Sequence, residues 1–318
     1  MTARTREESP FAFGLSLGGY FFGLVLLPQL AFILGPAPIA VNVLARRPNR
    51  AKVYVLVAIL AGTMGILTGV RSPMVTCILY SILGWPIAWA ILNRVAYKSL
   101  VMRVVACVFV TQVVLINLQW EQVIVEMAPI LEGFQEQRHG SEAGTLTDRQ
   151  IVNLNMIIWM LENWRDVYLG FSFAGSLAGV CLSLGWIYRG VRRETELEPM
   201  GSFSDLRPHD AMVWFAIGTA LLGFANSYWP AAWLQTTALN TAIGVFALYL
   251  LNGFSILLYG ISELRPNPIL ALVFLLVMFF FGGVFMLGIV GLFDTWGEFR
   301  KRIDARVQLV NDSDDRTE

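Results

Sequence analysis

The most constraining feature of this chain is a stretch of 52 residues, Ala211 to Ser262, that contains no Asp, Glu, Lys, Arg or His. As one straight helix it would be about 78 Å long, because an α-helix rises about 1.5 Å per residue. The hydrocarbon core of a bilayer is only about 30 Å thick. The stretch therefore predicts two membrane crossings, joined by an uncharged turn near Ser227–Pro230. A hairpin of this kind excludes most soluble functions.

The composition of the whole chain agrees with a membrane protein. Hydrophobic residues make up 56% and charged residues 14% of the 318 residues, and the mean hydropathy is +0.61. Soluble domains carry about 25% charged residues. The 23 basic residues are balanced by 23 acidic ones, so the chain lacks the basic footprint that nucleic acid binding requires.

We expect an all-α fold, a polytopic transmembrane helical bundle of about eight spans that forms a single integral membrane domain over residues 1–318. Spans in lipid must satisfy their own backbone hydrogen bonds, which favours helices. Gly35–Pro38 breaks the first span, and the apolar segment Ile39–Ala45 that follows is either a half-helix or a re-entrant piece. No repeat of fixed period stands out. The expected spans are residues 11–34, 53–70, 74–92, 104–118, 167–187, the two crossings of the charge-free hairpin, and 269–293.

Residues 119–166 form an extramembrane excursion with two amphipathic helices, which we expect to lie in the membrane interface. Thr147 and Gln150 have the spacing of a capping box at the start of the second helix. The excursion holds eight acidic and three basic residues, whereas the loops 46–52 and 94–103 are basic. The positive-inside bias therefore places the excursion outside and the two loops inside. The first helix carries an apolar stripe of Trp120, Ile124, Met127, Leu131 and Phe134.

The topology leaves one conflict at the polar C-terminal tail, residues 294–318. Placing every basic loop inside puts the basic start of this tail outside, unless one segment is re-entrant. The candidates for that segment are Ile39–Ala45 and the stretch around Asn240. The expected number of spans is therefore eight, give or take one.

No pattern in the chain predicts catalysis. Ionisable residues at membrane depth, which are costly and usually functional, are nearly absent. His139 and His209 lie in polar segments without a second ligand at metal spacing. The cysteines lie far apart in apolar runs, as is typical of small core residues; they are Cys77, Cys107 and Cys181. We expect no enzyme activity, no metal and no cofactor.

Uncharged polar residues do remain at membrane depth, and Gln235, Asn240 and Asn252 are the candidates for binding a substrate. One interpretation is helix–helix hydrogen bonding, at about 1 kcal/mol per bond. The other is a pocket for a small neutral or zwitterionic solute. Both interpretations stay open at this point.

Glycines recur along the first span as two overlapping G-x-x-x-G motifs. They are Gly14, Gly18, Gly19 and Gly23. Small residues on one helix face let another backbone approach closely in lipid. The face is either packed against helices of this chain or serves as a docking surface for another membrane subunit.

The carboxyl end reads Leu-Gly-Ile-Val-Gly-Leu-Phe-Asp-Thr-Trp-Gly-Glu-Phe-Arg-Lys-Arg from Leu287 to Arg302. This segment resembles the closing signature of the YybS-like bacterial membrane proteins, a family of unknown function. The stretch Asn240–Gly260 and the break at Gly35–Pro38 also resemble that family. The residues that match the closing signature are Gly291, Asp294, Trp296, Phe299 and Arg300.

The YybS-like family is similar to the substrate-binding S-components of energy-coupling-factor vitamin transporters. In those proteins a small-x-x-x-small face on the first helix docks the transmembrane coupling subunit. The resemblance therefore implies a docking role for Gly14 with Gly18 and for Gly19 with Gly23. Glycine stands here where the family usually has alanine.

Asp294 and Arg300 are expected to act as a structural lock at the end of the last span. On a continuing helix they are six residues apart and point to different faces. Asp294 would then meet another segment of the chain, while Arg300 would reach the lipid headgroups. Trp296 and Phe299, three residues apart, would share a face in the aromatic belt.

Together these observations predict a multi-pass protein of the bacterial inner (plasma) membrane. Its expected partners are the lipid bilayer, a small-molecule solute and a membrane coupling subunit, and not nucleic acid. The leading hypothesis is an S-component-like protein that binds a small solute for uptake with partner subunits. The alternative is a non-transport membrane scaffold or regulator.

Overall fold

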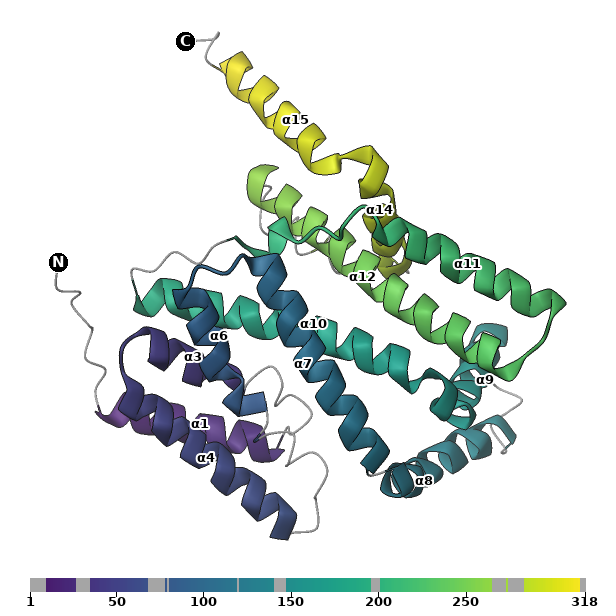
Figure 1. Cartoon of the computed structure of the whole chain (residues 1–318), viewed down its shortest axis with the longest axis horizontal. Coiled ribbons are helices and arrows are strands. Elements are labelled where there is room, and N and C mark those ends of the chain that lie inside the picture. The colour runs from purple at the N-terminus through teal and green to yellow at the C-terminus, as the bar shows by residue number, and fades with distance from the viewer. Residues whose placement is uncertain are drawn as a thin grey trace. The chain divides into compact units, whose positions relative to one another are not determined.

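The computed structural model of the chain is helical throughout the residues it describes. Within them it contains twelve α-helices, one short 3₁₀ helix and no strand (Figure 1). This confirms the all-α expectation. The described residues are 10–26, 35–67, 78, 80–118, 120–139, 147–195, 201–264, 273 and 283–314.

The helices cluster into two compact units. Unit 2 is formed by residues 109–174 and 215–244. Unit 1 is formed by residues 1–108, 175–214 and 245–318. Three long helices contribute residues to both units: α7 (Tyr97–Leu118), α10 (Trp164–Glu194) and α12 (Ala232–Leu264).

The same three helices, α7, α10 and α12, are long and apolar enough to cross a bilayer. Four further apolar segments are shorter, among them α11 (Met212–Tyr228) and α14 (Gly283–Gly297). The count of about eight spans is therefore not reached within the described residues, and most of the expected span 269–293 lies outside them. The charge-free hairpin is present as α11 and α12, with its turn at Trp229–Ala231.

Unit 1 contains a pair of nine-residue helices, α3 (Pro36–Leu44) and α6 (Gly84–Leu92), which pack against each other, while Trp85 and Trp89 of α6 are exposed. Each is about half the length that a membrane span needs. α3 is thus a half-helix, one of the two possibilities for this segment. The pair approaches closely at Gly84, where an added Cβ would lie 2.5 Å from the carbonyl oxygen of Pro36.

These two half-helices are copies of one pattern, 48 residues apart. Pro38-Ile39-Ala40 recurs as Pro86-Ile87-Ala88, and the isoleucine and alanine are buried in both copies. Each copy ends at an arginine in the left-handed region, with φ of 57° at Arg46 and 52° at Arg94. A longer helix follows each, α4 (Pro48–Leu67) and α7. The likeness between the two helices is limited to these short motifs.

In unit 2 the polar excursion folds as a helical hairpin, α8 (Trp120–His139) and α9 (Asp148–Glu162). The capping box at the start of α9 is present, with Thr147 and Gln150 bonded reciprocally. α8 and α9 pack on each other, and the apolar residues Leu154 and Ile158 of α9 are buried. Ile151 and Met156 of the same helix are exposed, so α9 is only partly covered by the described residues.

Candidate functional site

α12 and α14 pack backbone to backbone in unit 1, through glycines on both helices. A Cβ added at Gly253 would overlap the carbonyl oxygen of Leu287, and one at Gly291 would overlap that of Tyr249. No side chain fits between the helices at these two positions. The amide of Asn252 donates a hydrogen bond to the carbonyl oxygen of Gly291 at 2.7 Å, which fixes the helices along the same contact.

The chain reverses directly after this contact. α14 ends at Gly297, Glu298 takes a left-handed φ of 46°, and α15 (Phe299–Asp314) begins on the other side of the turn. The turn brings Arg300 back to Asp294, with Nη1 and Oδ2 2.8 Å apart. The other oxygen of Asp294 accepts the backbone N–H of Phe299 at 3.0 Å, and the Asp294 side chain is 2% exposed.

The guanidinium of Arg300 also holds the connector between α10 and α11. It donates to the carbonyl oxygens of Ser204 at 3.2 Å and Leu206 at 3.0 Å. On α12 it donates to the Ser255 hydroxyl at 2.8 Å and to the Asn252 side-chain oxygen at 3.3 Å. One partly buried cation thus joins α12, α14, α15 and the connector, an arrangement we call the Arg300 lock.

The geometry of the Arg300 lock corrects two expectations drawn from a continuing helix. Arg300 turns inward to Asp294 and does not reach towards headgroups, because the left-handed Glu298 ends α14. Trp296 and Phe299 belong to different helices for the same reason, and Trp296 is exposed. Each oxygen of the Asp294 carboxylate has a partner. This agrees with the expectation that Asp294 and Arg300 form a structural lock and not a catalytic pair.

The Arg300 lock pairs a buried carboxylate, Asp294, with a partly buried guanidinium. Burial lowers the pKa of the Arg300 guanidinium, and the adjacent Asp294 carboxylate acts in the opposite direction. An arginine stays protonated across all working pH values. Removing either partner would leave an uncompensated charge in a protein interior, which costs more than the pair itself contributes.

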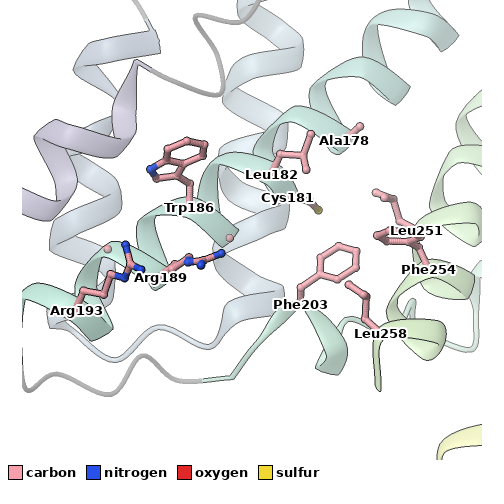
Figure 2. Close-up of a pocket in the computed structure, with 12 residues that line it drawn as sticks. Ala178, Cys181, Leu182, Trp186, Arg189, Arg193, Phe203, Leu251, Phe254 and Leu258 are labelled. Atoms are coloured by element: carbon pink, nitrogen blue, oxygen red, sulfur yellow. The ribbon is translucent and has the colours of Figure 1, made fainter. Parts of the chain in front are cut away.

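A separate cavity of about 640 Å³ lies between α10 and α12. Figure 2 shows Cys181 and Leu182 on α10, Leu251 and Phe254 on α12, and Phe203 of the connector around it. Pockets for small molecules typically have volumes of about 300–1,000 Å³ and mostly apolar walls. This volume fits that class of pocket.

A second cavity of about 410 Å³ adjoins the first. Both are lined by Gly185, Arg189, Arg193 and Phe203. The second cavity adds mostly polar residues, namely Tyr97, Tyr188, Arg192 and Ser202. Arginines near the end of a span are an ordinary topology signal. Nothing in the spacing of Arg189, Arg192 and Arg193 indicated that two helices flank a cavity beside them.

The three candidate substrate residues are not brought together. Gln235 is exposed on the unit 2 part of α12. Asn240 accepts the backbone N–H of Gly170 at 2.6 Å and donates to the carbonyl oxygen of Thr236, tying α12 to α10 within unit 2. Asn252 belongs to the Arg300 lock. Asn240 and Asn252 thus make the helix–helix bonds of the packing interpretation, and none of the three lines either cavity.

No residue that the structure describes covers the glycine face of α1 (Pro10–Leu26). A Cβ added at Gly14, Gly18 or Gly19 would meet nothing within 4 Å. The three glycines, with Leu15 and Phe22, line a surface groove of about 440 Å³. The surroundings of Gly23 lie outside the described residues.

The opposite side of α1 is packed on α4. The hydroxyls of Ser16 and Tyr54 are 2.6 Å apart, and the rings of Tyr20 and Tyr54 meet edge to face with centroids 5.2 Å apart. α1 therefore has one face buried within the protein and one face without cover from the described residues.

Comparison with known families agrees with this helical, apolar architecture. No curated protein and no solved structure matches the chain significantly. One family model matches, over residues 20–295, and its description is "Predicted membrane protein (DUF2232)". The matched region includes both half-helices, the α10–α12 cavity and the Asp294 side of the Arg300 lock. The chain belongs to the DUF2232 family of predicted membrane proteins, whose function is unknown.

Proposed function

We propose that this protein is an S-component-like subunit of the bacterial inner membrane, which holds a small solute for uptake and works with partner subunits. The observation that carries the proposal is the α10–α12 cavity, with its volume of about 640 Å³ and largely apolar walls. A pocket between membrane-spanning helices is where a bundle most often binds a small ligand. The solute site is assigned to this cavity and not to Gln235, Asn240 and Asn252.

The partner in this proposal is a membrane coupling subunit that lays a helix along the open groove of α1. Gly14, Gly18 and Gly19 leave room for a second backbone, while Leu15 and Phe22 are exposed beside them. Helices in lipid associate mainly through close packing of this kind. The opposite face of α1 is occupied by α4, so docking would not disturb the internal contact.

Filling the cavity tests the proposal. Gly185 lines it, and an added Cβ there meets nothing within 4 Å, so Gly185→Leu fills space without displacing the backbone. Gly175→Leu is the matched control, because it lies on the same helix, is equally open and does not line the cavity. The measurement is native mass spectrometry of protein purified in mild detergent.

We expect wild type and Gly175→Leu to retain a small molecule, and Gly185→Leu to lose it. If the three proteins carry no small molecule, or carry the same one equally, the solute-binding proposal fails. The second candidate, a membrane scaffold or regulator, would then remain. It is favoured by the open groove of α1, which requires a partner but no solute.

A further inference from the structure

The two adjoining cavities between α10, α12 and the connector differ in chemistry. The walls of the larger one are mainly aliphatic and aromatic, with Leu251, Phe254 and Leu258 on the α12 side. The smaller one is lined by three arginines near the end of α10, namely Arg189, Arg192 and Arg193. Figure 2 shows Arg189 and Arg193 on α10 beyond Trp186, away from Ala178. An occupant of both cavities would therefore be apolar at one end and in contact with cations at the other.

The three arginines have no carboxylate partner among the residues that the structure describes. The ion pairs found there occupy other cations, such as Arg47 with Glu194 at 3.4 Å and Arg300 with Asp294. Glu194, the residue next to Arg193, is thus already engaged elsewhere. All three arginines are exposed residues. Guanidinium groups that line one cavity offer an anion several donors, because each presents its N–H groups in a planar fork.

Two buried tyrosines line the same smaller cavity. Tyr97 and Tyr188 are 3% and 6% exposed, and their rings meet edge to face with centroids 5.3 Å apart. Within the described part of the chain, neither hydroxyl has a hydrogen-bond partner. Buried polar groups are nearly always bonded. Two unbonded hydroxyls beside three unpaired cations are an independent indication that a polar ligand group belongs here.

We propose that the occupant is an amphiphile whose phosphate head group carries a net negative charge, a refinement that rests on the proposed solute-binding function. Its apolar chain lies in the larger cavity between α10 and α12, and its phosphate lies against Arg189, Arg192 and Arg193. Guanidinium groups bind phosphate through paired, charge-assisted hydrogen bonds. Basic pockets between transmembrane helices are sites where phospholipid headgroups bind. The neutral or zwitterionic solute expected from the sequence leaves the three cations unmatched.

The test uses the full chain in nanodiscs and compares two lipids with identical acyl chains. One nanodisc contains phosphatidylglycerol and the other phosphatidylcholine. Native mass spectrometry counts the lipid molecules that stay bound to the protein after it is released from the nanodisc. We expect phosphatidylglycerol to be retained with a preference on the order of tenfold. Arg189→Gln and Arg193→Gln should each reduce that preference by on the order of fivefold. Arg103→Gln, which removes an exposed α7 arginine that lines neither cavity, should leave it unchanged.

Competition separates the possible sources of the amphiphile. Displacement of bound phosphatidylglycerol by octyl phosphate from solution supports a soluble amphiphile, and resistance to octyl phosphate supports a membrane lipid. Displacement by inorganic phosphate alone would show an anion site that ignores the apolar cavity, and it would overturn the proposal. Equal retention of the two lipids, or equal loss in Arg103→Gln and the two cavity variants, would also overturn it.

The cavity-filling variant Gly185→Leu separates a failure of the phosphate assignment from a failure of the proposed solute-binding function. If Gly185→Leu removes a retained molecule while the arginine variants have no effect, a solute site exists and the phosphate assignment is wrong. If wild type retains neither lipid nor any other molecule, the proposed function itself fails.

Discussion

Glycines line two helix faces in this protein, and the two faces are used in opposite ways. On α14, Gly291 lies against the backbone of α12, and an added Cβ would overlap a carbonyl oxygen. On α1, Gly18 has nothing within 4 Å of an added Cβ. Both faces carry glycines at helical spacing, so the spacing alone does not say whether the partner helix belongs to the same chain. What separates them is the polar lock: the α12–α14 face has Asn252, Asp294 and Arg300 beside it, and the described part of α1 has no ion pair.

The largest effect should come from breaking the Arg300 lock that closes the α12–α14 face. Asp294→Asn removes the only carboxylate paired to the partly buried Arg300 among the described residues. Loss of one partner of a buried pair costs about 3–5 kcal/mol. We expect a strongly lowered melting temperature in detergent, with ligand affinity falling only through that loss of stability.

Asp210→Asn is the matched control for the Arg300 lock, because Asp210 pairs with Arg207 at the surface, where such pairs contribute about 0–1 kcal/mol. An Asp294→Asn protein that melts like wild type but no longer binds a ligand or partner would contradict the structural role and indicate a functional one.

The next effect should come from adding a single methyl group at the closed face. Gly291→Ala forces α12 and α14 apart, and overpacking of this kind costs about 1–3 kcal/mol. Gly18→Ala adds the same atoms at the open face, where alanine gains about 0.5–1 kcal/mol of helix propensity over glycine. Thermal unfolding of the two variants in one detergent measures the contrast directly. Equal shifts would mean that the two faces are packed alike.

A larger substitution at the open face should change association and not folding. Gly18→Ile fills the groove of α1, so a partner helix can no longer approach, while the face packed on Tyr54 is untouched. We expect an unchanged melting temperature and loss of a co-purifying membrane subunit. Unfolding of Gly18→Ile would show instead that the groove is an internal contact, and the docking proposal would fail.

The smallest effect concerns the turn that makes the Arg300 lock possible. Glu298 holds a left-handed φ of 46°, which costs a non-glycine residue about 1–2 kcal/mol. Glu298→Gly relieves this cost but adds unfolded-state freedom and removes the exposed contact with Lys301. We expect these opposing effects to raise the free energy of unfolding by a few tenths of a kcal/mol. The measurement is the melting temperature, which should rise slightly. A clear destabilisation would show that the Lys301 contact matters more than backbone strain.

Local signals in the sequence were sufficient to predict the all-helical fold class and several helix boundaries. The charge-free hairpin, the Thr147–Gln150 capping box and the half-helix after Gly35–Pro38 depend on neighbouring residues, and the structure has all three. The Arg300 lock could not be derived in full, because glutamate at position 298 gives no signal for a left-handed turn. Its other acceptors, the carbonyl oxygens of Ser204 and Leu206, are backbone atoms that any residue would supply.

The candidate pocket was missed for a different reason. Its walls come from α10, the connector and α12, whose residues are separated by up to about eighty positions, and only the fold brings them together. The arginines at the end of α10 were visible, but a basic cluster beside an apolar segment is also the ordinary mark of a cytoplasmic boundary. The likeness of α3 and α6 gives a weak signal in the sequence, because only Pro-Ile-Ala and a distant arginine are shared.

The lengths of the three spanning helices have a consequence for the membrane itself. α7 has 22 residues, or about 33 Å of helix, which matches a hydrocarbon core of about 30 Å. α10 and α12 have 31 and 33 residues, or about 46 and 50 Å. Helices of such different lengths cannot all match one bilayer while upright, so the longer two must tilt or project beyond the core. The thickness of the lipid around this protein therefore governs how the length of α10 and α12 is divided between the hydrocarbon core and the water on either side.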